Sequence, residues 1–216
     1  MIEIKNLRII GSSHISPDSI QEAVDVIKDY QPEIVALELD SNRFVALMRQ
    51  EREKNPWKII KEIGIMGYLF NVIGFWVEKK LGEVVGVKPG SEMIAATKTA
   101  QECNAKIALI DRDIRVTIKR LFKLLTWKEK FRFLWDIISS PFAKRYAFDL
   151  SKVPDEKFIK EVIKIIKKRY PNFYKALVDE RDEHMAVNLK HLMQEHTKIV
   201  AVVGAGHLEG IVKRLQ

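Results

Sequence analysis

Apolar and polar positions alternate along the chain in two periods, one typical of buried strands and the other typical of amphipathic helices. Between the first two apolar runs, apolar residues recur at helical spacing from Ile20 to Ile27. Pro17 and Pro32 predict where this helix begins and ends. The order of strand, helix and strand predicts an α/β fold. Four short apolar runs predict strands that are buried on both faces, as in a parallel sheet: residues 7–10, 34–40, 106–111 and 198–203.

Two further segments predict helices that are inserted between the strands. Residues 63–77 are the most apolar stretch, but their 15 residues are fewer than the roughly 20 that span a bilayer. We expect a helical hairpin there that covers a site, packs against a second subunit in a homodimer, or lies at a membrane interface; burial in the core is the alternative. The segment 114–178 predicts several basic amphipathic helices that form an insertion or cap.

These segments together predict one domain. Its core would consist of residues 1–56, 82–113 and 179–216, with the apolar helical insertion at about 57–81 and the basic helical cap at about 114–178. The single cysteine, Cys103, excludes an internal disulfide and therefore a secreted scaffold of the disulfide-rich class. The first residues lack the pattern of a signal peptide, so we predict a cytoplasmic protein, with membrane association as a second hypothesis.

The formal net charge of +8 favours an acidic partner or an anionic surface. Much of this charge lies in the predicted cap, where Lys and Arg residues interleave with the aromatic residues Phe122, Trp127, Phe131 and Trp135. Such interleaving suits nucleic acid or anionic lipid, which would make a peripheral membrane contact. The aromatic positions also fit a buried stripe at helical spacing. We favour the buried stripe and expect no specific binding of nucleic acid, because no nucleic-acid-binding motif accompanies the charge.

Two Gly-x-x-His motifs carry the strongest candidate chemistry. They span residues 11–14 and 204–207, and each follows a predicted strand directly. The two histidines, His14 and His207, should therefore lie at the carboxyl edge of the sheet, where open α/β sheets bind ligands. Glu38 and Asp40 share one face at the end of the second predicted strand, near His14 if the first two strands are parallel neighbours.

Two imidazoles and one carboxylate are a common open site for a divalent transition metal, and they leave a position for a bound water that the metal acidifies. We therefore predict that His14, Glu38 and His207 are metal ligands and that the metal is the cofactor. Asp40 would support a ligand or cap the helix that begins near Ser41.

Further charged residues have two interpretations each. Glu92 is either a general base or fourth ligand, or a helix-terminal carboxylate that complements the dipole. Asp111, Arg112, Arg43 and Arg181 either orient ligands and bind a substrate carboxylate, or form a buried network of ion pairs.

Six ordered motifs make the chain resemble the TraB family, which belongs with the Tiki-like proteins, a group proposed to be metalloproteases. The resemblance implies an α/β fold with a mixed, largely parallel central sheet flanked by helices, and a cleft that both Gly-x-x-His histidines and an acidic residue face. It also implies metal-dependent peptide cleavage in some relatives and shutdown of a peptide signal in others. The motifs are GSSHIS at 11–16, VALELD at 35–40 with Arg43, PGSEM at 89–93, LIDRDIRVTIKR at 109–120, ERDEHMA at 180–186 and VVGAGHLEG at 202–210.

Family members often carry hydrophobic spans after this domain. The end of the chain at Gln216 leads us to expect a stand-alone form or an excised domain. Our leading hypothesis is a metal-dependent, peptidase-like hydrolase that acts on a peptide substrate. The alternatives are a non-catalytic protein that binds a peptide or an amphiphile, and a protein that binds haem or iron.

Overall fold

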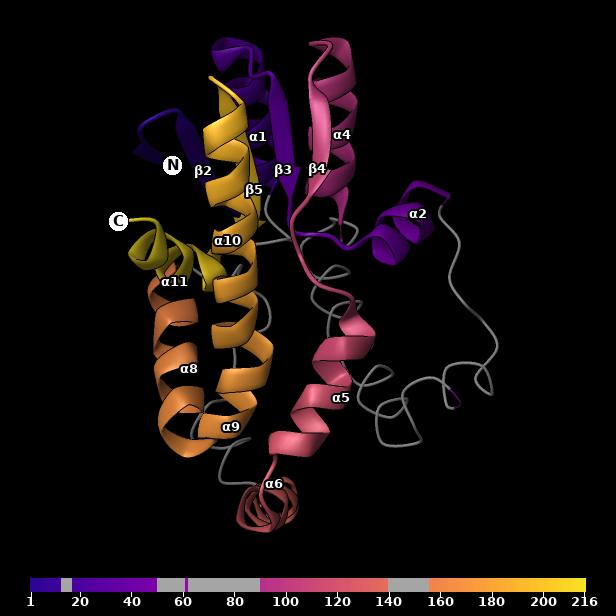
Figure 1. Cartoon of the computed structure of the whole chain (residues 1–216). Coiled ribbons are helices and arrows are strands. Elements are labelled where there is room, and N and C mark those ends of the chain that lie inside the picture. The colour runs from indigo at the N-terminus through magenta and orange to yellow at the C-terminus, as the bar shows by residue number, and fades with distance from the viewer. Residues whose placement is uncertain (13–16, 50–60, 62–89, 140–155) are drawn as a thin grey trace.

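The computed structural model describes residues 1–12, 17–49, 61, 90–139 and 156–216 (Figure 1). Its centre is a five-stranded sheet with the order β1-β2-β5-β3-β4. β1 pairs with β2 in antiparallel orientation, and the other three pairings are parallel. The predicted α/β fold with a mixed, largely parallel sheet is therefore confirmed. The strands are β1 (Ile2–Ile4), β2 (Leu7–Ser12), β3 (Ile34–Leu37), β4 (Lys106–Leu109) and β5 (Ile199–Gly204).

The last strand of the chain lies in the middle of the sheet, between β2 and β3. Ile199 of β5 is in register with both Leu7 of β2 and Ile34 of β3. The first two predicted strands, β2 and β3, are therefore not neighbours. The prediction that His14 lies near Glu38 had required them to be adjacent. Because β5 is central, the second Gly-x-x-His motif emerges at the carboxyl edge between the ends of β2 and β3. Crevices at such an edge are where open α/β sheets bind ligands.

Helices cover both faces of the sheet and bury two separate apolar clusters. On one face lie α10 (Glu180–Glu195) and α11 (Ala205–Leu215), whose Met185, Leu189 and Ile211 pack on the strands. On the other lie α1 (Pro17–Tyr30) and α4 (Ser91–Glu102), which contribute Ile27 and Met93. The strands β3 and β5 are buried throughout, which explains their continuous apolar sequences.

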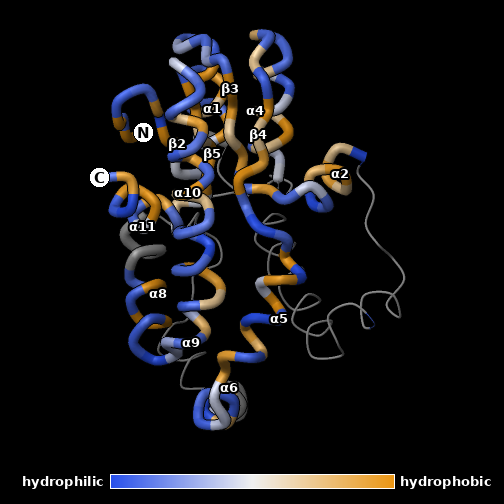
Figure 2. The backbone as a smooth tube through the Cα atoms, viewed as in Figure 1, coloured by the Kyte–Doolittle hydropathy of each residue, from blue (hydrophilic) through white to orange (hydrophobic). Residues whose placement is uncertain are grey.

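The remaining helices lie beyond the carboxyl edge of the sheet (Figure 1). α5 (Ile114–Leu124) shows apolar positions alternating with hydrophilic ones in Figure 2, as its amphipathic sequence predicts. A five-residue π-helix, η1 (Lys175–Asp179), joins α9 to α10, and such bulges are frequent at functional sites. The other helices are α2 (Ser41–Arg49), α6 (Trp127–Ser139), α8 (Glu156–Arg169) and α9 (Pro171–Tyr174).

The structure corrects the interpretation of the aromatic stripe in α6. Trp127, Phe131 and Trp135 are 74%, 67% and 67% exposed, so the expected burial is wrong at these three positions. The reason is that the inward face of α6 carries the buried carboxylates of Glu129 and Asp136, which bind polar groups of neighbouring helices. His14 and the apolar segment 63–77 lie outside the described residues.

Candidate functional site

Glu38 follows β3 directly and lies buried at the carboxyl edge of the sheet, with 4% of its surface exposed. Its backbone N–H donates to the Val202 carbonyl at 3.1 Å, which keeps the chain beside β5 for one residue past the strand. The carboxylate then reaches over the end of β5. There Oε2 accepts a hydrogen bond from the Gly204 N–H at 2.6 Å, while Oε1 accepts one from Arg181 Nη2 at 2.6 Å.

His207 lies in the first turn of α11, three residues after the strand ends, and is buried. Its Nδ1 is 2.6 Å from Asp182 Oδ1, and its Nε2 is 3.0 Å from Arg181 Nη1 and 3.3 Å from Glu38 Oε1. A guanidinium has only donors, so Nε2 accepts the hydrogen bond from Arg181, and the protonated Nδ1 donates a hydrogen bond to Asp182 Oδ1. The Nε2 lone pair is therefore directed at Arg181 Nη1, and Glu38 Oε1 lies 3.3 Å from the same nitrogen.

Arg181, in the first turn of α10, connects these groups. Its Nη2 donates to Glu38 and also to Asp111 Oδ2 at 2.7 Å, and its Nε donates to Asp111 Oδ1 at 3.1 Å. Burial by itself disfavours the charge on Arg181, but its attraction to Glu38 and Asp111 outweighs this and raises the pKa of the guanidinium. The site thus contains one permanent buried cation between two carboxylates. We call Glu38, Asp111, Arg181, Asp182 and His207 the strand-end cluster.

Asp182 supports His207 from α10 and depends on a glycine in α11. It is 1% exposed, and burial raises the pKa of its carboxyl group against the opposing effect of the His207 hydrogen bond. A Cβ atom at Gly210 would lie 1.9 Å from Asp182 Oδ2, closer than non-bonded atoms can approach. Only glycine at position 210 therefore leaves room for the carboxylate that fixes the imidazole.

Four of the predicted site residues meet in the strand-end cluster: Glu38, Asp111, Arg181 and His207. Arg43 joins them at the edge, because its Nη1 donates to Asp111 Oδ2 at 3.2 Å. Asp111 and Arg181 therefore form a network of ion pairs within the candidate site, and Arg43, with 40% of its side chain exposed, extends that network to the surface.

Other predicted residues lie elsewhere. Arg112 donates to Glu180 Oε2 and to the Ala176 carbonyl, which ties the start of α5 to the π-helix. Asp40 caps α2, since its Oδ1 accepts from the backbone N–H groups of Asn42 and Arg43. Glu92 is buried in the first turn of α4, on the opposite side of the sheet from α10. Among the residues that the structure describes, no group of three His, Cys, Asp or Glu side chains is placed to hold a metal ion.

Asp182 and Gly210 are the site residues that the sequence-based prediction missed. A signal for Asp182 exists, because it precedes Met185, Ala186 and Leu189 by three, four and seven residues, all of which are buried. A carboxylate on the apolar face of a helix requires a buried partner. The partner, His207, is 25 residues away in sequence, and no local pattern joins the two.

Comparison with known proteins identifies the family. A profile described as the TraB/PrgY/gumN family matches residues 3–216, which is nearly the whole chain. The chain belongs to this family. The predicted resemblance is thereby confirmed, and the motifs that carried it contain the strand-end cluster: Glu38 in VALELD, Asp111 in LIDRDIRVTIKR, Arg181 and Asp182 in ERDEHMA and His207 in VVGAGHLEG.

Two relatives show how far the similarity to the TraB/PrgY/gumN family extends. The chain is 40% identical to an uncharacterized protein of Methanocaldococcus jannaschii over 98% of its own length and 53% of that protein. It is 26% identical to the TraB domain-containing protein of Homo sapiens over 95% of its length and 61% of the human protein. The chain thus spans little more than half the length of these relatives. Within the described ranges, the structure contains no helix long and apolar enough to cross a membrane.

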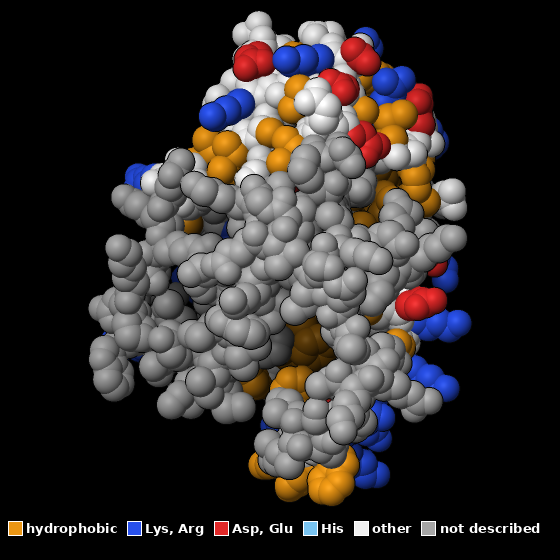
Figure 3. All heavy atoms as spheres, turned by 180° about the vertical axis from the view of Figure 1, so that it is seen from behind, with side chains coloured by type: hydrophobic (Ala, Val, Ile, Leu, Met, Phe, Trp, Pro, Cys, Tyr) orange, Lys and Arg blue, Asp and Glu red, His pale blue; other side chains and the backbone are white. Residues whose placement is uncertain are grey.

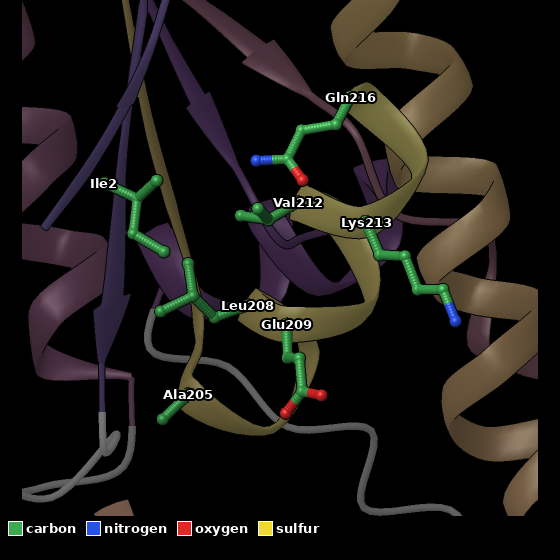
Figure 4. A pocket seen from close by; sticks show the side chains of 7 residues that line it. All are labelled: Ile2, Ala205, Leu208, Glu209, Val212, Lys213 and Gln216. Atoms are coloured by element: carbon green, nitrogen blue, oxygen red, sulfur yellow. The ribbon is translucent and has the colours of Figure 1, made fainter.

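A separate pocket of about 360 Å³ lies between α11 and β1 (Figure 4). Leu208 and Val212 of α11 and Ile2 of β1 provide its apolar lining, and Glu209 and Lys213 contribute charged groups. None of its lining residues belongs to the strand-end cluster. The two faces of α11 therefore differ: His207 faces Asp182 on α10, whereas the adjacent Leu208 lines this pocket.

Proposed function

We propose that the protein is a metal-dependent hydrolase of peptide-like bonds. In this proposal Glu38 Oε1 and His207 Nε2 hold a divalent transition metal, and His14 is the third ligand. The observation that carries the proposal is the pairing of these two donor atoms, 3.3 Å apart, with the Asp182 carboxylate behind the imidazole.

The two donor atoms have the separation that one metal requires. Two ligands at about 2.1 Å from a tetrahedral zinc ion lie about 3.4 Å apart. Metal-binding histidines generally donate their second ring N–H to a carboxylate, as His207 Nδ1 does to Asp182. The second oxygen of Glu38 is held by the Gly204 N–H, so that carboxylate is also oriented. The separation of the two atoms and the hydrogen bonds that orient them support the proposed metal site.

Arg181 lies beside both donor atoms and has to move when a metal binds. Its guanidinium donates to Glu38 Oε1 and to His207 Nε2, the same atoms that a metal would take. Asp111 holds the other edge of the guanidinium through two hydrogen bonds, so the group can turn toward Asp111 and stay at the site. There it would donate to the oxygen that becomes negative as a peptide carbonyl is attacked.

The remaining chemistry divides between the metal and the protein. When bound, a divalent metal supplies a Lewis acid that makes a bound water nucleophilic near neutral pH. Asp182 keeps the proton on Nδ1 of His207 and leaves the Nε2 lone pair for the metal. Asp111 and Glu38 balance the charge of Arg181 while the site is without substrate. Burial of the cluster keeps bulk water from these hydrogen bonds and strengthens each of them.

Metal binding tests the proposal directly. The full chain and its His207→Ala and Glu38→Gln variants are dialysed against Zn²⁺, Mn²⁺ or Co²⁺, and bound metal is measured by elemental analysis and calorimetry. We expect one metal per wild-type chain and its loss in both variants. His191→Ala is the matched control, because His191 is exposed on α10 and should leave binding unchanged.

Hydrolysis of a mixture of fluorogenic peptides then tests the reaction. Activity should need added metal and should disappear in the same two variants. Equal metal content in wild type, His207→Ala and His191→Ala would contradict the proposed ligands. Circular dichroism of each variant separates loss of the ligand from loss of the fold.

A further inference from the structure

α6 is attached to the rest of the molecule through polar groups. Its Glu129 completes a capping box, in which Glu129 Oε2 accepts from the Thr126 N–H and Thr126 Oγ1 accepts from the Glu129 N–H. The same carboxylate accepts two hydrogen bonds from Asn172 at the start of α9. Although burial opposes it, these bonds lower the pKa of Glu129, so the carboxylate is ionised in its buried position.

Asp136 makes a second polar attachment two turns further along α6. It accepts hydrogen bonds from the Arg169 guanidinium, at the end of α8, and from the Tyr170 hydroxyl. Glu129 and Asp136 are seven residues apart and therefore lie on the same face of the helix. That face is turned toward α8 and α9, and the rotation of α6 about its own axis is set by these two carboxylates.

The opposite face of α6 is aromatic and exposed. Trp127, Phe131 and Trp135 follow one another at intervals of four residues and are between 67% and 74% exposed. The rings of Trp127 and Phe131 are 6.3 Å apart, and Lys130 Nζ lies 4.8 Å from the Trp127 ring. Among the described side chains of α6, Trp127, Phe131 and Trp135 thus face outward while the two carboxylates face inward, the reverse of a helix that packs on a core.

In the described part of α5 and α6, the exposed charged residues all have one sign. Both acidic residues of α6 are buried, and α5 contains no acidic residue. Figure 3 shows hydrophobic side chains beside Lys and Arg side chains at the end of the molecule where α6 lies. The exposed basic residues of the described part of α5 and α6 are Lys119, Lys123, Lys128, Lys130 and Arg132.

We propose that the exposed aromatic face of α6, defined by Trp127, Phe131 and Trp135, binds the surface of a membrane that contains anionic phospholipid. An amphipathic helix with aromatic residues on one side and basic residues at its flanks lies in the plane of the headgroups and buries its apolar side at the acyl boundary. The charge complementarity favours anionic lipid over an uncharged partner, since each lysine or arginine near such a surface raises partitioning about fivefold.

This inference does not depend on the proposed hydrolase. In Figure 1, α6 lies at the end of the molecule farthest from the sheet, so contact with a membrane there leaves the strand-end cluster uncovered.

Vesicle flotation with the full chain tests the proposal. Vesicles of phosphatidylcholine alone are compared with vesicles that also contain phosphatidylserine, at low and high salt. The aromatic variant is Trp127→Ser/Phe131→Ser/Trp135→Ser. Its matched control is Val45→Ser/Val187→Ser, which changes two other exposed apolar residues, at 46% and 49% exposure.

Two charge variants are tested beside the aromatic variant, so that the proposal can still be tested if the aromatic variant does not fold. Lys128→Glu/Lys130→Glu changes the flanks of α6, and Lys98→Glu/Lys190→Glu changes two exposed lysines on α4 and α10.

The expected result is binding to the anionic vesicles that high salt weakens. The aromatic variant should lose this binding, and Lys128→Glu/Lys130→Glu should reduce it by more than about 25-fold, the product of two lost lysines. Both control proteins should bind as the wild type does. Equal binding by the Lys128→Glu/Lys130→Glu protein and the wild type, or no binding by the wild type, would overturn the proposal.

Two other results would assign the surface to a different partner and likewise overturn the proposal. Light scattering that shows a wild-type dimer and a monomeric aromatic variant, without vesicle binding, would mean that a second copy covers α6. Binding to a single-stranded RNA oligonucleotide that is lost in the aromatic variant, without vesicle binding, would mean that the surface takes nucleic acid.

Discussion

Replacement of Gly210 by alanine has two opposing effects on stability: alanine favours the helix, but its Cβ displaces the Asp182 carboxylate. In the interior of a helix, glycine to alanine stabilises by about 1 kcal/mol. Here the new Cβ would lie 1.9 Å from Asp182 Oδ2 and 2.7 Å from its Cγ, so the carboxylate has to retreat. That movement breaks the 2.6 Å hydrogen bond to His207. A hydrogen bond with a charged partner contributes about 1.5–3 kcal/mol, so we expect a net destabilisation of roughly 0.5–2 kcal/mol.

Urea denaturation of a double-mutant cycle measures this effect. Asp182→Ala removes the obstructing carboxylate, so Gly210→Ala should become stabilising by about 1 kcal/mol in that background. Gly206→Ala is the control in the same helix, because its Cβ would lie 3.2 Å from the terminal Cδ1 of Ile163, which can move. The reasoning is refuted if Gly210→Ala has the same effect on the free energy of unfolding with and without Asp182. If the metal site is as proposed, Gly210→Ala also weakens metal binding 10- to 100-fold.

Two further predictions concern ion pairs. Arg181→Met leaves two buried carboxylates without their cation and should lower the free energy of unfolding, measured by urea denaturation, by about 3–5 kcal/mol. Arg214→Met is the control, because it loses a partly exposed ion pair with Asp179 and should lower the free energy of unfolding by less than about 1 kcal/mol. Equal losses in the two variants would contradict the central place of Arg181. The hydrogen bonds from Arg169 and Tyr170 lower the pKa of Asp136. Its contribution to stability is therefore present above the unfolded pKa of about 3.9 and is lost as the pH falls through the folded pKa. The difference in unfolding free energy between wild type and Asp136→Asn should narrow toward about pH 2, and an undiminished difference would show that the charge of Asp136 is not the cause.

Much of the fold follows from local patterns. The apolar runs at 7–10, 34–40, 106–111 and 198–203 each coincide with a strand of the parallel part of the sheet. β2 and β5 extend beyond their runs, whereas β3 and β4 end before the acidic residues that close theirs. Periodicity also located α1, and the basic amphipathic pattern of 114–178 indicated the helical character of the segment that contains α5, α6, α8 and α9. β1 escaped notice because a three-residue edge strand with one exposed residue carries little hydrophobic pattern.

The candidate site was partly predictable because it uses the ends of strands. A carboxylate that follows a buried strand, such as Glu38 or Asp111, has to lie at the edge of the sheet. A histidine that opens the helix after a strand, such as His207, has to lie at the same edge if the strands are parallel. The assignment of Asp182 to His207 could not be predicted, because it depends on how α10 packs against α11.

The sequence by itself determined which segments form the four parallel strands and the first helix, and the ends of those strands placed Glu38, Asp111 and His207 at one edge, because burial and chain direction are local properties. Only the tertiary structure decided that β5 lies between β2 and β3, that Arg181 connects the acids to the imidazole, and that the aromatic face of α6 turns outward. Each of these depends on contacts between residues far apart in sequence. Such contacts depend on which of several packing arrangements of the whole chain is most stable. The hydrophobic periodicity of a single segment carries no information about that choice.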